Sequence, residues 1–345
     1  MNTMKALVLE APEQLRCKEI PIPAPKGDEL LIRVRACGVC GTDLHMYHGD
    51  KGAFANAFPL VMGHEFSGEV AALGPDASKF QVGDHVAVDP NLYCGKCPAC
   101  LRGDVHFCEH MTGIGTTRDG GFAEYCAVSE RAAYRIPDEV PFEYAAMMEP
   151  LSCCLHGIDR SNIHPGDTVV IIGFGAIGQM MFQLAQLSGA ARIVVVEPVA
   201  SKRKKAEEMG AFLTCDPQRE DVSEKLQALH FHSVIECVGR KDTMELAVQI
   251  AGSCATVMLF GLTAPGTKLE LLAYESIFQK ELTITGSFIN PLVSQRVVDL
   301  LSSGRLDLGK IIAVRLPLAE GVRAFTEKGL SADGKIVIGD FPAAH

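Results

Sequence analysis

The residues best suited to chemistry lie between positions 37 and 65 of the chain. They occur in two runs, Cys37-Gly-Val-Cys40-Gly-Thr42-Asp43-Leu-His45 and Gly63-His64-Glu65. Thiol, imidazole and carboxylate groups are ligands of zinc in proteins, and a catalytic zinc needs only three of them plus an open position. The two runs therefore predict a reactive metal site, but the use of the metal has to come from elsewhere in the chain.

Cys37 and Cys40 also form a C-x-x-C pair, which in some proteins is a redox dithiol. A redox pair of this kind should open a helix, and the flanking Gly38 and Gly41 argue against a helix at this point because glycine is a poor helix former. The two thiols by themselves leave both interpretations open.

A second group of cysteines has the spacing of a structural zinc site: Cys94-Gly-Lys-Cys97-Pro-Ala-Cys100, followed by Cys108. Four thiolates complete a tetrahedral zinc site and leave no position for a substrate, so this ion would hold a loop together. An iron–sulfur cluster is a weaker alternative, since the ferredoxin pattern continues with C-x-x-x-C-P and no proline follows Cys108 here. An empty or disulfide-bearing loop is the third alternative.

A dinucleotide-binding pattern begins near residue 165. Residues 165–172 form a buried-strand run, and the turn Gly173-Phe-Gly175-Ala-Ile177-Gly178 leads into a helical stretch that extends to about Ser188. A second strand at 192–196 ends in Glu197. The glycines allow a tight turn, a close approach of backbone N–H groups to a pyrophosphate, and close helix packing, and an acid in the place of Glu197 can bind the adenosine ribose.

Glu197 also bears on the choice of cofactor. A carboxylate at this strand end would repel the 2′-phosphate of NADP, so NAD is predicted. Lys202 and Arg203 on the next helix weigh against this, because a cation there can meet a phosphate. Lys202 is predicted to contact the cofactor.

The order of strand and helix patterns predicts an α/β chain with two domains. The first half has strand-and-turn character, for example at residues 4–9 and 29–36. After the glycine turn, a helix at 201–209 and strands near 211–215, 233–237, 256–260 and 282–286 complete a parallel sheet.

Composition limits the partners. The 345 residues carry a net charge of −10, which argues against nucleic acid or an anionic membrane as the main partner. The N-terminus lacks the apolar core of a signal peptide, and glycines divide the apolar run 168–185 into a strand and a helix. A cytoplasmic protein without membrane spans is expected.

Together these motifs resemble the zinc-dependent medium-chain alcohol and polyol dehydrogenases over nearly the whole chain. The resemblance rests on Cys40-Gly-Thr-Asp-Leu-His45, Gly63-His64-Glu65-Phe-Ser-Gly68, the Cys94–Cys108 lobe, Glu149-Pro-Leu-Ser152 and the glycine turn. It implies a GroES-like catalytic domain at 1–154, completed by 290–345, and a doubly wound Rossmann domain for NAD at 155–289. It also implies that Cys40, which directly precedes Gly-Thr-Asp, is the zinc thiolate and that Cys37 is a bystander.

The resemblance implies a role for each site residue. Cys40 and His64 would bind the catalytic zinc, with Glu65 as a third ligand or close neighbour and Glu149 binding the metal directly or through its water. Thr42, the nicotinamide ribose and His45 would carry the substrate proton to solvent, with Glu149 or a zinc-bound water as the competing route. Asp43 is expected to orient a ligand. Glu149 as a plain helix-start carboxylate and His45 as an ordinary surface histidine are the structural alternatives.

The predicted reaction is hydride transfer between NAD and a secondary hydroxyl of a polyol or sugar alcohol, with two zinc ions per chain. Ile289 stands where sorbitol dehydrogenases have an arginine, and Met46 stands where they have an aromatic residue, so sorbitol itself is doubtful. Threonine 3-dehydrogenase and a simple secondary-alcohol dehydrogenase are the enzymatic alternatives. An NAD-binding crystallin-like or sensor protein is the non-enzymatic one. The resemblance also implies a homodimer or homotetramer, formed through the strand at 282–286.

Overall fold

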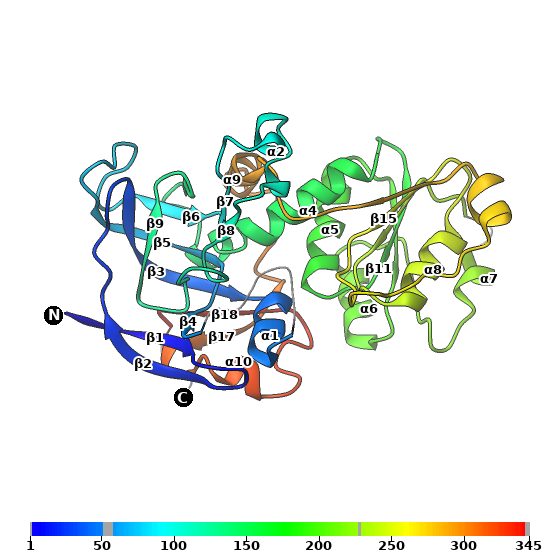
Figure 1. Cartoon of the computed structure of the whole chain (residues 1–345). Coiled ribbons are helices and arrows are strands. Elements are labelled where there is room, and N and C mark those ends of the chain that lie inside the picture. Colours follow the sequence, from blue (N-terminus) through cyan, green and yellow to red (C-terminus); the bar gives the residue numbers. More distant parts are fainter. Residues whose placement is uncertain (1, 51–57, 227–228, 342–345) are drawn as a thin grey trace. The chain divides into compact units, whose positions relative to one another are not determined.

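The computed structural model describes residues 2–50, 58–226 and 229–341. Its internal contacts divide the chain into two compact units, residues 1–152 with 291–345, and residues 153–290. The first unit is rich in β-structure, and the second is built on a parallel sheet (Figure 1). The predicted α/β fold class is confirmed.

The first unit is organised around a seven-stranded sheet in which β3 is the hub. The sheet has the order β10-β6-β5-β3-β18-β17, and β9 also pairs with β3. Its strands are β3 (Glu29–Val39), β5 (Glu65–Leu73), β6 (His85–Val88), β9 (Tyr125–Ser129), β10 (Ala133–Arg135), β17 (Ile312–Pro317) and β18 (Lys335–Gly339).

The register of this sheet determines what meets at the end of β3. Gly38 of β3 pairs with Glu65, the first residue of β5. Val39 pairs with Ile336 at the start of β18. Directly opposed residues in an antiparallel pair lie about 5 Å apart. The residues just after β3 and those that open β5 and β18 are therefore brought together, although they lie far apart in sequence.

Smaller elements complete the first unit. A three-stranded sheet has the order β2-β1-β4, and a hairpin pairs β7 with β8. These strands are β1 (Thr3–Leu9), β2 (Leu15–Pro21), β4 (Leu60–Val61), β7 (Asn91–Leu92) and β8 (Thr112–Gly113). The helices are α1 (Gly41–His48), α2 (Pro98–Leu101), η1 (Val105–Phe107), α3 (Phe142–Ala145), α9 (Ser294–Ser302), η3 (Leu318–Glu320) and α10 (Arg323–Thr326).

The helix α1 corrects one expectation. The glycines at 38 and 41 argued against a helix after Cys40, but α1 begins at Gly41. The Asp43 carboxylate accepts a hydrogen bond from the Cys40 backbone N–H at 2.9 Å, which stabilises the start of the helix. Gly49, at φ 77°, ends it, and its N–H donates to the carbonyls of His45 and Met46.

The second unit is a six-stranded parallel sheet with the order β13-β12-β11-β14-β15-β16. Its strands are β11 (Thr168–Ile172), β12 (Arg192–Val196), β13 (Leu213–Cys215), β14 (Ser233–Glu236), β15 (Thr256–Leu259) and β16 (Thr283–Gly286). Its helices are α5 (Ala176–Leu187), α6 (Ala200–Glu208), α7 (Val222–Leu226), α8 (Lys241–Ile250) and the π-helix η2 (Ala273–Phe278). The predicted strands of this sheet are confirmed to within three residues at each end, the largest difference being the start of β11, which was predicted at residue 165 and lies at Thr168.

Packing against the helices explains why the inner strands β11 and β12 are continuous apolar runs. Helix α5 packs on β11 and β12, α6 on β12 and β13, and α8 on β14 and β15 (Figure 1). Both faces of such a sheet are covered, so nearly every side chain of β11 and β12 is buried. Helix α4 (Met148–Arg160) contains the boundary between the two units. Among the described residues, no helix is both long and apolar enough to cross a membrane.

Candidate active site

The ends of β3 and β5 bring three candidate metal ligands together. Cys40, His64 and Glu65 each offer a ligand atom, and these atoms lie within 4.8 Å of one another. Cys40 Sγ lies 3.1 Å from His64 Nε2. The structure therefore gathers the thiol, the imidazole and one carboxylate of the sequence prediction. Cys37 is not part of this group: it is buried within β3, and burial raises the pKa of its thiol.

Asp43 fixes the orientation of the His64 ring. Its Oδ1 lies 3.3 Å from His64 Nδ1, so that Nε2 points to Cys40. Asp43 is fully buried. A carboxylate behind a histidine ligand is the usual second partner in zinc sites. Burial lowers the pKa of His64, but the Cys40 and Asp43 charges outweigh it and raise that pKa well above its ordinary value.

The polar atoms of this site fit a bound zinc ion. Asp43 Oδ1 and His64 Nδ1 face each other at 3.3 Å, and the buried Glu65 Oε2 lies beside Lys335, but none of these three atoms has a partner in hydrogen-bond geometry. Unpaired buried polar atoms are costly. A cation among Cys40, His64 and Glu65 would compensate the negative charge of the thiolate and the carboxylate. Thiolate, imidazole and carboxylate are a donor set that zinc accepts.

Lys335 is a site residue that sequence reasoning missed. It opens β18, is only 5% exposed, and its Nζ donates to Glu65 Oε1 at 2.6 Å. Glu65 Oε2 lies beside the same ammonium, but without hydrogen-bond geometry. Burial lowers the pKa of Lys335, yet Glu65 raises it to about 12, so the lysine stays charged. Glu65 thus faces both the ligand group and a buried cation.

Gly38 leaves the space that this ion pair fills. A Cβ at Gly38 would overlap Glu65 Oε2 and lie 2.9 Å from Lys335 Cε. We expect Gly38→Ala to displace the pair and to destabilise the protein by about 1–3 kcal/mol, as overpacking does. Urea unfolding and zinc content after dialysis measure this. Gly41→Ala is the matched control, because a Cβ there meets nothing within 4 Å. Equal behaviour of the two variants would contradict the prediction.

Glu149 lies in the first turn of α4 and is nearly buried. It is not part of the Cys40, His64 and Glu65 group. Burial raises the pKa of Glu149 to about 7; the His64 charge lowers it, and the Glu65 and Asp89 charges raise it. His64, Glu65 and Asp89 all belong to the first unit, as Glu149 does. Its role as a ligand stays a prediction.

Thr42 and His45, the two members of the predicted proton relay, lie on α1. His45 is 53% exposed, and its Nδ1 lies 2.8 Å from Asp50 Oδ2. Gly49 turns the chain so that Asp50 comes back to His45, and the Asp50 N–H donates to the His45 carbonyl. Asp50 was not identified from the sequence, although a glycine followed by an acid just past a helix end is a visible signal. The relay role of Thr42 and His45 stays a prediction.

The four cysteines of the lobe also meet. The sulfur atoms of Cys94, Cys97, Cys100 and Cys108 lie within 4.8 Å of one another. Backbone N–H groups point at the sulfurs: that of Cys97 lies 3.3 Å from the Cys94 sulfur, and those of Cys94 and His110 lie 3.3 Å from the Cys108 sulfur. Hydrogen bonds from the backbone of Cys100 and Glu109 lower the pKa of Cys97 to about 6. The thiols of this loop are free, and the set fits a structural zinc.

The glycine turn of the second unit has the shape that a dinucleotide needs. Gly173, at φ 90°, follows β11, and a Cβ on Gly178 would overlap the Gly173 carbonyl oxygen. A Cβ at Gly175 would meet nothing within 4 Å, which leaves the start of α5 open to a ligand. Ile177 lies in the first turn of α5, and Lys202 is half-buried on α6.

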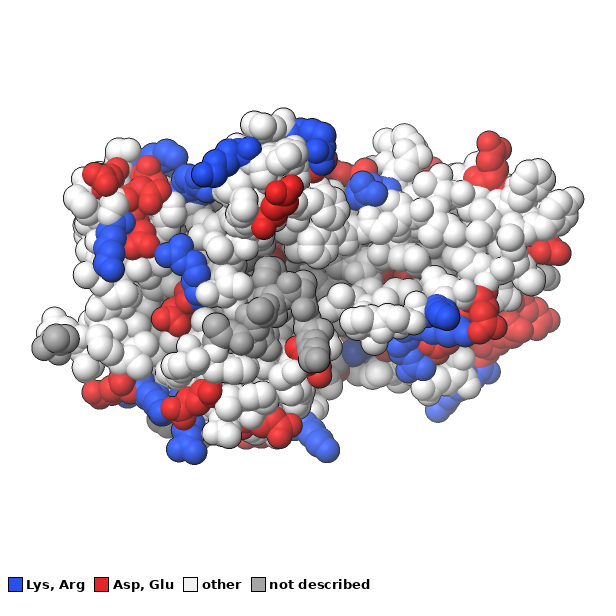
Figure 2. Space-filling model, in the orientation of Figure 1, with Lys and Arg blue, Asp and Glu red and all other residues white. Residues whose placement is uncertain are grey.

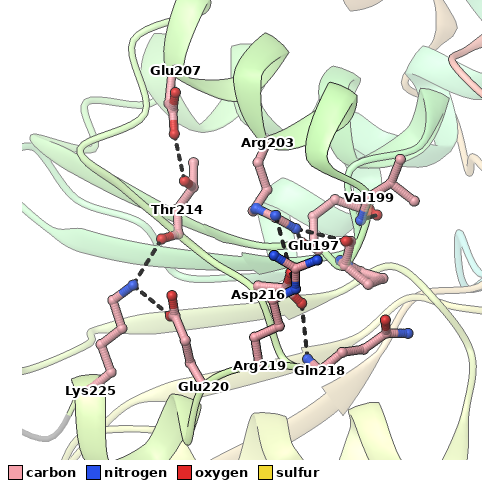
Figure 3. A network of polar contacts seen from close by, with 11 residues as sticks. Glu197, Val199, Arg203, Glu207, Thr214, Asp216, Gln218, Arg219, Glu220 and Lys225 are labelled. Atoms are coloured by element: carbon pink, nitrogen blue, oxygen red, sulfur yellow. Dashed lines mark hydrogen bonds and ion pairs between the residues drawn. The ribbon is translucent and has the colours of Figure 1, made fainter.

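Glu197 is placed at the end of β12 and is 4% exposed. One oxygen accepts the Phe174 N–H at 2.8 Å, and the other accepts the Val199 N–H at 2.9 Å. The carboxylate therefore holds the glycine turn and the start of the following segment together. Figure 3 shows Glu197 beside Val199 of that segment. A carboxylate accepts about four hydrogen bonds, so contact with a ribose remains compatible with these two.

Comparisons with known proteins agree with these sites. Residues 26–138 match the alcohol dehydrogenase GroES-like domain, and residues 176–303 match the zinc-binding dehydrogenase family. D-arabitol-phosphate dehydrogenase from Enterococcus avium is 32% identical over 99% of both chains. L-threonine 3-dehydrogenase from Pyrococcus horikoshii is 35% identical over 85% of this chain and 86% of its own.

A solved structure matches the fold of the whole chain. A protein of Sinorhizobium meliloti, described as a zinc-binding dehydrogenase and bound to NADP, is 38% identical, with a TM-score of 0.94 over 98% of this chain and 99% of its own. The metal-ligand group, the cysteine lobe and the glycine turn thus occur together in a chain whose relatives are dehydrogenases. The protein belongs to the zinc-dependent medium-chain alcohol and polyol dehydrogenase family.

Proposed function

We propose that the protein oxidises a secondary hydroxyl of a polyol or sugar alcohol with NAD, and that Cys40, His64, Glu65 and Glu149 serve a catalytic zinc. The observation that carries the proposal is the convergence of the Cys40, His64 and Glu65 ligand atoms. A second zinc would be held by the four cysteines of the lobe. The Glu149-Pro-Leu-Ser152 sequence and the arabitol-phosphate relative support a polyol substrate.

Each residue has a distinct task in this proposal. When bound, zinc would lower the pKa of a substrate hydroxyl, and the nicotinamide would accept the hydride. Asp43 orients His64, and Lys335 holds Glu65 in place. Thr42 and His45 pass the proton outward. Asp50 fixes the His45 ring through Nδ1, so the other ring nitrogen is left for the proton path.

The substrate class is tested by following NADH formation with a panel of sugar alcohols, butanediol and threonine. A polyol is expected to give the highest kcat/KM. A clear preference for threonine or for butanediol would replace the polyol proposal with one of the two enzymatic alternatives. Protein that binds NAD and holds about two zinc ions, the number that both sites require, but turns over no alcohol would favour the sensor-like alternative.

The relay role of His45 predicts a change in pH dependence. We expect His45→Gln to lower turnover by about a hundredfold at pH 6 and by less at pH 9, because a solvent base is scarce at low pH. The measurement is kcat against pH. His48→Gln is the matched control, because His48 lies on the same helix, is 51% exposed and also faces a carboxylate, that of Glu13. An unchanged pH profile in His45→Gln would remove this histidine from the relay.

We further propose a cytoplasmic homodimer or homotetramer that associates through β16. This strand is the last of its sheet, and an open strand edge invites pairing. The π-helix η2 ahead of it exposes Tyr274 and Phe278, whose rings stack at 5.6 Å. Thirteen free cysteines suit a reducing compartment. Light scattering should give the mass of a dimer or tetramer, and a monomer would contradict the proposal.

The surface charge also supports a small-molecule substrate. On the face shown in Figure 2, Lys and Arg side chains are interspersed with Asp and Glu and with uncharged surface. The net charge is −10. Binding to nucleic acid depends on a clustered positive surface. The proposal therefore includes neither nucleic acid nor membrane as a partner.

A further inference from the structure

An ion-pair network lies at the carboxyl ends of β12 and β13, beside the glycine turn. Strands β13, β12 and β11 are neighbours in the parallel sheet, so the residues that follow them meet at one edge. Glu197 follows β12 and Asp216 follows β13. Arg203, on α6, lies between them (Figure 3). In parallel α/β sheets, this edge is where a dinucleotide binds.

The Arg203 guanidinium is occupied on two sides. Its Nη1 donates to the backbone carbonyls of Glu197 and Pro198, both at 2.7 Å. Its Nη2 lies 3.1 Å from Asp216 Oδ2, and the side chain is only 17% exposed. Both hydrogens of Nη1 are thus used on the backbone of the β12–α6 turn, and Asp216 holds the other nitrogen.

Asp216 is the anchor of this arrangement. Its side chain is 8% exposed, its Oδ1 accepts the Gln218 N–H at 3.0 Å, and its Oδ2 faces Arg203. The exposed Arg219 also points at it, with Nε 3.8 Å from Oδ2. This buried carboxylate therefore holds Arg203 and also lies within ion-pair distance of the exposed Arg219. The Glu197 carboxylate points the other way, to the Phe174 N–H of the glycine turn.

This arrangement bears on the 2′-position of the cofactor. A 2′-phosphate brings nearly two negative charges close to Glu197 and needs a cation to meet it. The similar Sinorhizobium meliloti protein binds NADP. The fold therefore does not exclude the 2′-phosphate of NADP, and the preference between NAD and NADP must depend on side chains. In this chain, Arg203 on α6 is turned onto Asp216 and onto backbone carbonyls.

We propose that Asp216 is a specificity-determining residue that keeps Arg203 from the adenosine 2′-position and so makes the protein prefer NAD over NADP. The inference rests on the proposed function only in placing the cofactor at this glycine turn. Replacing Asp216 removes one negative charge and releases the Nη2 side of the Arg203 guanidinium, which can then bind a phosphate.

The test is equilibrium binding of NADH and of NADPH to the zinc-loaded protein, by calorimetry and without substrate. The wild type should bind NADH at least about tenfold more tightly, and Asp216→Asn should reduce that ratio by about tenfold through tighter NADPH binding, the effect of one charge-assisted hydrogen bond. Glu220→Gln is the matched control, because it removes the same charge from a nearby surface carboxylate that pairs with Lys225. Its ratio should equal that of the wild type.

A second pair of variants identifies the cation. Arg203→Leu alone should leave the ratio of NADH affinity to NADPH affinity unchanged. This variant tests the inference even if Asp216→Asn does not fold. Arg203→Leu with Asp216→Asn should lose most of the gain in NADPH binding. A wild type that prefers NADPH, an unchanged ratio in Asp216→Asn, or a selective loss of NADPH binding in Arg203→Leu would overturn the inference.

The two proposals fail in different ways. If neither dinucleotide binds, the proposed function fails and this inference falls with it. If both bind but the ratio does not respond to Asp216, only this inference fails.

Discussion

Replacing Lys335 by methionine is expected to destabilise the zinc-free protein by about 3–5 kcal/mol, the cost of removing one partner from a buried ion pair. Lys335 and Glu65 are 5% and 2% exposed. Without the ammonium, the Glu65 carboxylate stays buried and has to be protonated or exposed. Urea unfolding of zinc-free protein measures the effect, because a bound cation would offer Glu65 another partner.

A surface lysine and a double variant serve as controls. Lys18, on β2, pairs with Glu10, which follows β1, and their side chains are 41% and 34% exposed, so Lys18→Met should cost less than about 1 kcal/mol. Replacing Lys335 and Glu65 together by methionine should recover most of the loss, since apolar residues of similar size can substitute for a buried pair. Losses that simply add in the double variant would show that the two side chains are not coupled.

The ligand residues were predictable because each of them lies in a short motif. Cys40 directly precedes Gly-Thr-Asp, and His64 and Glu65 are adjacent, so local sequence carries the signal. Lys335 was missed because the pairing of β3 with β18 brings it to Glu65 from 270 positions away. A lysine at the start of an apolar strand is ordinarily an exposed end residue. Only the register of the sheet shows that this one points inward.

Hydrogen-bond partners were less predictable than elements. Apolar runs and glycines were enough to place the strands β11 to β16. The signal is clearest for β11 and β12, since a strand that is covered on both faces must be apolar throughout. The same pattern could not show that Glu197 accepts two backbone N–H groups, or that Arg203 is bound to Asp216. These contacts depend on how neighbouring strand ends meet. The expectation that no helix follows Cys40 was wrong for a related reason. The Asp43 carboxylate accepts the Cys40 N–H and so offsets the poor helix propensity of Gly41.

Zinc should stabilise the protein more strongly as the pH rises, by about 1.4 kcal/mol per pH unit for each proton that the metal displaces. Burial raises the pKa of Cys40, an effect that His64 reduces, and the Cys40 and Asp43 charges hold the pKa of His64 well above its usual value. In the zinc-free protein both groups therefore keep their protons near neutral pH. Zinc has to displace them.

The direction in which the stability of the zinc-free protein changes with pH follows from the pKa shifts of His64 and Cys40. For His64, the folded pKa is above the unfolded value of about 6.5, so its contribution to the zinc-free fold is complete below that pH and is lost as the pH rises through the folded value. For Cys40, a raised pKa means that the fold disfavours the thiolate, so zinc-free protein also loses stability above the unfolded pKa of about 8.5. Both effects lower zinc-free stability at high pH.

The measurement compares urea unfolding of zinc-loaded and chelator-treated protein from pH 6 to pH 9. Cys40→Ser is the control, because it disables the Cys40, His64 and Glu65 group and keeps the cysteine lobe. The lobe contributes equally to the slope in both proteins, with the pKa of Cys97 lowered to about 6 and burial raising that of Cys100 to about 12, so the difference between the two slopes reports the Cys40, His64 and Glu65 group. If wild type and Cys40→Ser show the same slope, the protons do not come from Cys40 and His64. A steeper slope in the wild type locates the proton release at the site where the β3 and β5 ends meet.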